Sequence, residues 1–327
     1  MNRRVASAFR NLVGRPFQGR LGRGPERAAL LVLLGCALLG SNARAQQSAD
    51  VKAVHVQGSV YMIVGAGANL AVQVGEQGVF VVDTGAAPFT DRVIAAIREL
   101  SKKDIRWIVN TTLDPDHIGG NEKISSIGRT VNGNPAAIIA HEKLPLRMVR
   151  QAAPVPVAAR PLNTFFGAAK DFFFNDDPVF VYHTPAHTDG DTIVYFRHSD
   201  VIVAGDTFLT TTYPVIDIAN GGSAQGFIDG LNRILDITVP KHLQEGGTLV
   251  IPGHGRISDE AGVLEYHDMI VIVRDRIRDA LKKGLTLEQV KAARLTRDFD
   301  PRYAAASGPS STANFVESMY RDLSRSK

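Results

Sequence analysis

The chain has 327 residues, with 37 lysines and arginines against 33 aspartates and glutamates, which gives a net charge of +4. Hydrophobic residues make up 44% and charged residues 21%, a balance that excludes intrinsic disorder, a fibrous repeat and a multi-span membrane protein. The single cysteine excludes a disulfide framework and cysteine-based zinc or iron–sulfur sites.

Residues 1–45 have the pattern of an export signal peptide. Seven arginines precede an apolar run over residues 28–39, and an A-x-A cleavage pattern ends at Ala45. The run is shorter than the roughly 20 residues that span a bilayer, so we expect no membrane span. Cys36 stands in a context that resembles a lipobox. Cleavage after Ala45 is favoured over acylation of Cys36, because the apolar run continues beyond the cysteine.

The basic charge of the chain is concentrated in this leader. Removing residues 1–45 takes away eight arginines and one glutamate and leaves 29 basic and 32 acidic residues, a net charge of −3. The charge therefore gives no support for a nucleic-acid partner. We expect residues 46–327 to form a periplasmic or secreted domain that acts on a small molecule.

The first half of this domain alternates β-rich runs and glycine-rich turns. The apolar residues Val93, Ile94, Ile97 and Leu100 recur at a helical spacing and predict one amphipathic helix. The strands expected in this half cover residues 60–64, 69–74, 79–83, 105–110 and 136–140, with a loop over residues 111–121.

The second half begins with a less regular stretch, residues 142–178, that contains five phenylalanines. Residues 286–289 form a capping box for a short helix. Strands are expected over residues 179–182, 192–196, 201–204 and 247–251, and helices over residues 223–235, 259–283 and 314–323. Strands and helices thus occur in two similar sets, which predicts an α+β fold of two β-rich halves covered by helices.

Several loops that follow the apolar strands carry histidine and aspartate. Imidazole and carboxylate are the ligands that a hydrolytic zinc site uses when thiolate is unavailable. Loops at strand ends are also where a rigid scaffold presents such groups. The candidate metal ligands are Asp114, Asp116, His117, His187, Asp206 and His254.

These loops resemble the motifs of the metallo-β-lactamase superfamily, across nearly all of residues 55–265. The resemblance implies an αββα sandwich with the metal site at one edge. The matching segments, taken in order, are Val82-Asp-Thr-Gly85, Asp116-His-x-Gly-Gly-Asn121, Ala186-His-Thr-x-Gly-Asp191, Ala204-Gly-Asp206 and Pro252-Gly-His-Gly255.

One motif departs from the family pattern. The family usually has His-x-His-x-Asp-His, whereas this chain has Thr112-Leu-Asp114-Pro-Asp116-His117. The resemblance assigns the two missing histidines, together with His187, to the first metal position. Thr112 is a poor zinc ligand, and both Thr112 and Asp114 could instead form turn hydrogen bonds.

The second metal position of the family is intact here. By resemblance, Asp116, His117 and His254 would hold the ion, and Asp206, usually the bridging carboxylate, would join them. The resemblance therefore favours one Zn²⁺ per chain, with Asp114 and His187 as a weak second site. Asp83 is expected to orient the neighbouring loops.

A single zinc ion limits the chemistry that the site can perform. Zinc lowers the pKa of a bound water to about 7, so hydroxide is available at neutral pH. Displacement of chloride from an electron-poor aromatic ring needs no second Lewis acid and no proton for the leaving group. The stripped motif and the leader resemble the chlorothalonil hydrolytic dehalogenases of this superfamily, which implies replacement of a ring chlorine by hydroxyl.

The substrate pocket and two other functions stay open. Ser126, Phe172 and Phe173 are candidate pocket residues for an apolar aromatic substrate, although Ser126 also fits a helix surface and the phenylalanines also fit a core or a homodimer contact. One alternative function is a periplasmic esterase, thioesterase or β-lactamase in which Asp114 and His187 hold a second metal. The other is a non-catalytic metal- or ligand-binding homologue.

Overall fold

The computed structural model describes residues 50–150 and 155–325. The predicted leader, with Cys36 and the cleavage point after Ala45, lies outside the described residues and stays a prediction. In the described part of the chain, no helix is both long enough and apolar enough to cross a membrane.

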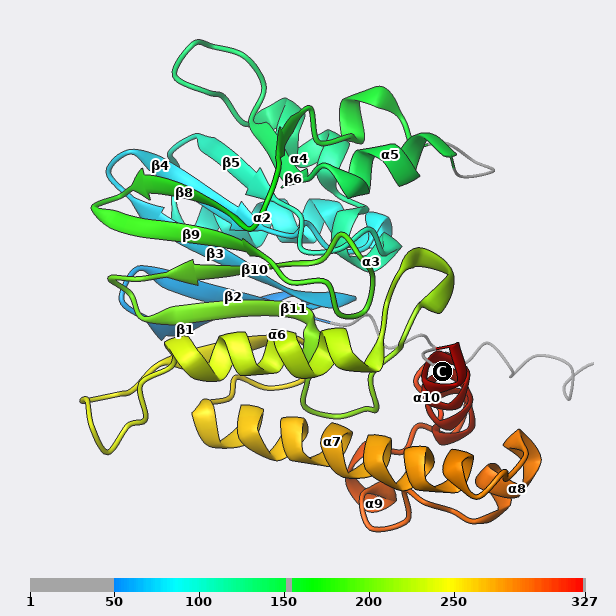
Figure 1. The fold of residues 1–327 in the computed structure, drawn as a ribbon. Coiled ribbons are helices and arrows are strands. Elements are labelled where there is room, and N and C mark those ends of the chain that lie inside the picture. Colours follow the sequence, from blue (N-terminus) through cyan, green and yellow to red (C-terminus); the bar gives the residue numbers. More distant parts are fainter. Residues whose placement is uncertain (1–49, 151–154, 326–327) are drawn as a thin grey trace, which may run out of the picture. The chain divides into compact units, whose positions relative to one another are not determined.

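Two β-sheets stack face to face, and helices cover their outer faces (Figure 1). The first sheet runs antiparallel from β1 to β4 and parallel from β4 to β7. Its strands, in spatial order, are β1 (Lys52–Gln57), β2 (Val60–Ala66), β3 (Ala68–Gly75), β4 (Gly78–Val82), β5 (Ile105–Val109), β6 (Ala137–His141) and β7 (Asn163–Phe165).

The second sheet is antiparallel except for its last pair, β11 and β12, which is parallel. In spatial order its strands are β12 (Leu249–His254), β11 (Val201–Leu209), β10 (Thr192–Phe196), β9 (Asp177–His183) and β8 (Ala169–Phe174). Alternate side chains of both sheets point inward and form one apolar layer between them. Phe80 and Phe196, from opposite sheets, meet edge to face with ring centroids 5.6 Å apart.

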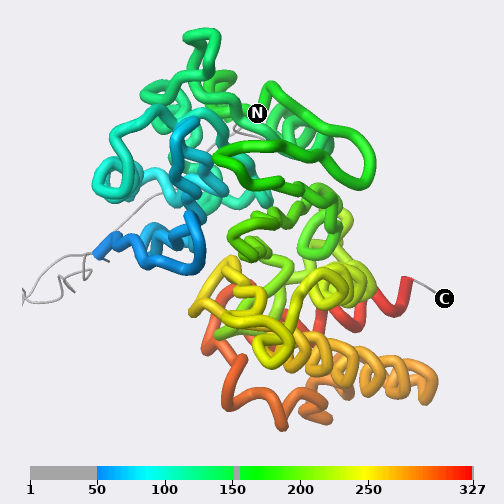
Figure 2. The backbone as a smooth tube through the Cα atoms, turned by 90° about the vertical axis from the view of Figure 1, so that its left-hand side faces the viewer, coloured from blue at the N-terminus to red at the C-terminus, as the bar shows by residue number. Residues whose placement is uncertain are grey.

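The helices divide between the two outer faces. Apolar residues of α2 (Thr90–Leu100) and α4 (Asn121–Ile127) pack on the first sheet. The second sheet is covered by α6 (Ala224–Ile237) and α7 (Glu260–Lys282), and α10 (Thr312–Arg325) packs against these two helices. In the side view, the cyan segments lie on one side of the two sheets, and the orange and red segments lie on the other side (Figure 2). The predicted αββα sandwich is confirmed.

Shorter helices complete the described residues, namely α3 (Pro115–Ile118), α5 (Lys143–Arg150), α8 (Leu287–Ala292), α9 (Asp300–Tyr303) and three 3₁₀ turns, η1 (Ala87–Phe89), η2 (Val157–Ala159) and η3 (Ile218–Asn220). The capping box predicted at residues 286–289 is present at the start of α8. The loop predicted over residues 111–121 is wrong in part, because it contains α3. The irregular stretch of residues 142–178 contains α5, β7 and β8.

Candidate metal centre

The six candidate ligands meet at one edge of the sandwich, although they come from four separate segments. Asp114 caps the start of α3, and Asp116 and His117 lie within that helix, just after β5. His187 follows β9, Asp206 lies within β11, and His254 ends β12. Strands of both sheets therefore deliver ligands to the same edge.

Three of these side chains form a first group, consisting of Asp116, His117 and His254. One ligand atom from each lies within 4.8 Å of the others. His254 Nε2 is 3.3 Å from Asp116 Oδ2. His117 is fully buried, whereas the side chain of His254 is about one-third exposed. The first group is therefore open to solvent on the His254 side.

A second group consists of Asp114, His187 and Asp206, again with ligand atoms within 4.8 Å of one another. His187 Nε2 is 3.3 Å from Asp114 Oδ2. Asp206 also belongs beside the first group, because its Oδ1 is 3.3 Å from His117 Nε2 and 3.7 Å from His254 Nε2. The site is thus two ligand groups that share one carboxylate, where the sequence favoured one intact group and one weak site.

The arrangement fits divalent metal ions. His117 Nε2, His187 Nε2 and Asp206 Oδ1 are buried and have no hydrogen-bond partner among the described residues, a costly state that a cation would relieve. Ligands at 2.0–2.1 Å from a tetrahedral zinc lie about 3.3 Å from each other. Three of the four His–Asp distances across the two groups have that value. The donor set and its spacing are those of metal sites.

Neighbouring groups fix the orientation of both buried histidines. His117 Nδ1 donates to the Asp83 carboxylate at 2.8 Å, and His187 Nδ1 donates to the carbonyl of Val215 at 2.8 Å. In each ring the other nitrogen, Nε2, is thereby left to face the site, as is usual for metal-binding histidines. The predicted orienting role of Asp83 fits this geometry. The role of Val215 could not be read from the sequence, because a backbone carbonyl carries no sequence signal.

Asp83 is itself tightly held. Its carboxylate accepts hydrogen bonds from the backbone N–H and the hydroxyl of Thr111, at 2.8 and 2.5 Å. Its backbone adopts a φ of 62°, an unfavourable conformation for a residue with a side chain. The Asp83 carboxylate therefore joins the end of β4 to the segment after β5 while it positions His117.

The carboxylates shift the protonation of the histidines. Burial alone would lower the pKa of His117, but the nearby Asp206 and Asp83 carboxylates raise it well above its ordinary value. Burial likewise opposes protonation of His187, yet the nearby carboxylates, Asp114 above all, raise its pKa to about 10. In the absence of a metal the site thus holds protons, which a bound cation would displace.

A cavity of about 730 Å³ opens over the two groups. Asp114, Asp116, His187, Asp206 and His254 contribute to its wall. Leu209, Val215, Ile216 and Pro309 supply the apolar part, and Thr211, Thr212, Asp217, Ser310, Asn314 and Ser318 supply further polar groups. The cavity is large enough for a small organic molecule beside the candidate ligands.

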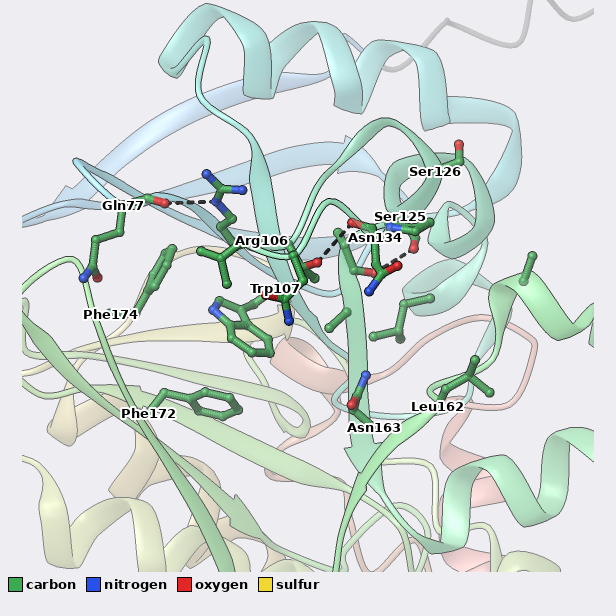
Figure 3. Close-up of a pocket in the computed structure, with 18 of the residues that line it drawn as sticks. Gln77, Arg106, Trp107, Ser125, Ser126, Asn134, Leu162, Asn163, Phe172 and Phe174 are labelled. Carbon is green, nitrogen blue, oxygen red and sulfur yellow. Dashed lines mark hydrogen bonds between the residues drawn. The ribbon is translucent and has the colours of Figure 1, made fainter.

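The predicted pocket residues Ser126, Phe172 and Phe173 lie elsewhere. All three line a second cavity, of about 1310 Å³, which shares no lining residue with the first (Figure 3). Phe172 belongs to the edge strand β8 and packs against Trp107, with ring centroids 5.4 Å apart. Ser126 is exposed on α4 and donates to the carbonyl of Lys123. None of them borders the cavity over the ligands, and their role in substrate binding stays a prediction.

Comparison with known proteins places this site in a family. The model of the metallo-beta-lactamase superfamily matches residues 56–254. A linear primary-alkylsulfatase from Pseudomonas sp. is 23% identical over 257 residues, which is 65% of this chain and 47% of the relative.

Solved structures show the same fold. The sec-alkylsulfatase Pisa1 from Pseudomonas sp. superposes with a TM-score of 0.63 and 14% identity, over 83% of this chain and 50% of that one. A metallo-beta-lactamase from Pontibacter korlensis gives a TM-score of 0.52 and 15% identity, over 67% and 98%. The chain spans about half the length of the alkylsulfatases that it matches. These comparisons support the superfamily and not the predicted dehalogenase subgroup. The chain belongs to the metallo-beta-lactamase superfamily.

Proposed function

We propose that the protein is a hydrolase in which divalent metal ions, held by the two ligand groups, activate water against an uncharged small substrate. The observation that carries the proposal is the pair of groups that share Asp206 beside a 730 Å³ cavity. A bound divalent ion supplies a Lewis acid and lowers the pKa of a coordinated water to about 7.

The residues of the chain position this chemistry. Asp83 and the Val215 carbonyl hold the rings of His117 and His187 so that both Nε2 atoms face the site. Asp206 Oδ1 lies 3.3 Å from His117 Nε2 of the first group, and Asp206 is itself a member of the second group, so it links the two. Ions held by these residues would supply Lewis acids for the hydrolysis of a carbonyl substrate.

The wall of the cavity favours an uncharged substrate. Apart from the candidate metal ligands, its described lining residues include one carboxylate, Asp217, and no lysine or arginine. The hydroxyl groups of Thr211, Thr212, Ser310 and Ser318 can hydrogen-bond a neutral polar group without a countercharge. An ester, thioester or lactone meets these conditions, and we propose this class as the substrate.

We also propose hydrolytic dehalogenation as a reaction of this site, ranked below ester, thioester or lactone hydrolysis. An electron-poor chlorinated aromatic is also uncharged, and its hydrolysis uses the same activated water. Two features of the structure weaken the sequence-based case for dehalogenation, which rests on a single zinc ion and a phenylalanine-lined entrance. The second ligand group is assembled around His187, and the phenylalanines expected at the entrance line another cavity.

Alkyl sulfate hydrolysis is the second candidate, because two alkylsulfatases are among the related proteins. A sulfate ester is anionic, and the described residues of the cavity wall include no lysine or arginine to pair with it. The metal ions would then be its only positive partners. The two candidates therefore differ in the charge of the substrate that the enzyme accepts.

A substrate panel tests the proposal. The purified, zinc-loaded protein is assayed with an aryl ester, a thioester, a lactone, a β-lactam, chlorothalonil and dodecyl sulfate, with product, chloride or sulfate release as the readout. We expect turnover of the uncharged acyl substrates, and its loss in the His117→Ala variant. Sulfate release alone would contradict the proposed substrate class. Metal binding without any turnover would favour a non-catalytic homologue.

A further inference from the structure

The two ligand groups offer different donor atoms, although they share Asp206. The first group presents two imidazole nitrogens, from His117 and His254, beside the Asp116 carboxylate. The second presents one imidazole nitrogen, from His187, and the carboxylates of Asp114 and Asp206. With Asp206 counted in both, each group has two carboxylates, but the second has one imidazole nitrogen where the first has two, and so the higher proportion of oxygen donors.

The oxygen-rich character is built into the fold. Asp114 occupies the N-cap of α3, with an extended backbone, and its Oδ2 lies 3.3 Å from His187 Nε2. Two residues earlier, Thr112 is fully buried, and its hydroxyl has no hydrogen-bond partner among the described residues. Neither side chain supplies nitrogen.

His187 shows that the second group is a site and not a chance cluster of acids. Its ring is 4% exposed, and its Nδ1 is committed to the Val215 carbonyl. Its Nε2 is buried, faces Asp114 and lacks a hydrogen bond among the described residues. The Asp114 side chain is 40% exposed and borders the cavity, so water can complete the coordination of an ion held there.

Donor type selects among divalent metals. Imidazole suits zinc, whereas carboxylate and water suit manganese and magnesium, which keep higher coordination numbers. Resting on the proposed function, we infer that the two positions differ in metal preference. The Asp116–His117–His254 group takes zinc, and the Asp114–His187–Asp206 group takes a harder ion of the manganese type.

The test measures metal binding and not activity. Protein stripped with a chelator is loaded with one equivalent of zinc, and Mn²⁺ is titrated in while free Mn²⁺ is followed by its electron paramagnetic resonance signal. Zn²⁺ is titrated in a parallel series, because zinc binds most nitrogen and oxygen sites more tightly than manganese. The tested quantity is therefore the ratio of zinc to manganese affinity at the second position.

We expect one Mn²⁺ to bind to the one-zinc protein. Asp114→His should raise the zinc-to-manganese affinity ratio at the second position about tenfold or more, because it exchanges a carboxylate for an imidazole. Asp114→Ala should abolish manganese binding and retain the first zinc, which also shows that the variant is folded. His254→Ala is the matched control, and should weaken the first zinc while manganese still binds.

Two results would overturn the inference. One is an absence of Mn²⁺ binding to the one-zinc protein, and the other is an unchanged affinity ratio in Asp114→His. Because neither readout depends on turnover, failure of the proposed hydrolysis would appear separately, in the substrate panel.

Discussion

At the scale of single residues, the site depends on Asp206, the side chain that contacts both ligand groups. It lies in β11 beside Gly253 of β12, where a Cβ atom would come within 2.2 Å of Asp206 Oδ1. A side chain at position 253 would therefore displace the shared carboxylate. Close packing against Asp206 therefore explains why the Pro252-Gly-His254 motif has glycine at position 253.

A substitution of Asp83 tests whether the hydrogen bond that orients His117 contributes to metal binding. In Asp83→Asn the carboxylate that fixes His117 is lost, and metal affinity should fall about 10- to 100-fold, as is typical for such partners. Competition against a metal-binding dye measures the change.

Asp177→Asn is the matched control for this variant. Asp177 is also a buried carboxylate with several hydrogen bonds, to His198 and Ser199, but it has no contact with the ligands. The Asp177→Asn variant should lose stability and keep the metal affinity of the wild type. Equal metal affinity in Asp83→Asn and the wild type would refute the positioning role.

A stacked histidine pair makes a second prediction at this scale. His141 and His183 stack with ring centroids 3.6 Å apart, and burial, followed by the charges of His183 and Lys143, lowers the pKa of His141 to about 4. The unfolded chain then binds the extra proton between the ordinary value of 6.5 and 4. The unfolding free energy of metal-free protein should therefore fall as the pH drops through that window.

Chemical denaturation at several pH values measures this dependence. His141→Phe should flatten it, because the buried titrating group is removed. Exposed His242 supplies the control, since His242→Gln should keep the pH dependence of the wild type. A wild-type slope in His141→Phe would show that other groups cause the effect.

At the scale of elements, much of the fold could be predicted because alternating apolar residues mark strands and a helical spacing marks α2, α6 and α7. The elements that were missed are short or lie at edges. β7 has three residues, and the three phenylalanines of the edge strand β8 are consecutive, so neither shows the alternation of apolar and polar residues that marks a strand. α3 has four residues and begins at Pro115, which also fits a loop.

The residues of the site could be predicted from the sequence, but their division into two groups that share Asp206 could not. Each candidate ligand stands in a short motif after an apolar strand, so the sequence identifies it. The place of Asp206 between the groups depends on an irregular register between β11 and β12, around Gly205 and Leu209. No spacing in the sequence fixes that register.

Helix α7 illustrates how an element is held. Its buried residues Val263, Tyr266, Ile270, Val273 and Ile277 recur every three or four positions and face the second sheet and its neighbouring helices. Ile270→Ala should cost about 2–5 kcal/mol of unfolding free energy, through lost burial and a cavity. On the same helix Ile272 is 40% exposed, and Ile272→Ala should cost less than about 1 kcal/mol. Similar losses in urea denaturation of both variants would contradict the packing of this face.

At the scale of the whole molecule, the proposed function puts the substrate in the cavity over the ligands and not in the larger cavity. The larger one is bordered by Trp107 and Phe172, and Figure 3 shows Leu162 and Asn163 across from them. Phe172→Ala should reduce stability by about 2 kcal/mol, since the ring is only partly buried, and leave kcat/KM unchanged.

Asn314→Trp is the contrasting variant, because Asn314 borders the cavity over the ligands. It should raise KM by obstruction while stability changes little. A large loss of kcat/KM in Phe172→Ala at full metal content would place the substrate in the larger cavity after all.

We propose that the two ligand groups, which share Asp206, hold the metal ions that drive hydrolysis. The most direct measurement compares metal content per chain and ester turnover in wild type and His117→Ala, after both proteins have been equilibrated with excess divalent metal and desalted. We predict that the wild type retains metal and hydrolyses the ester, and that the variant loses metal and turnover together. Full turnover by His117→Ala, or turnover by wild type from which all metal has been removed, would contradict the account.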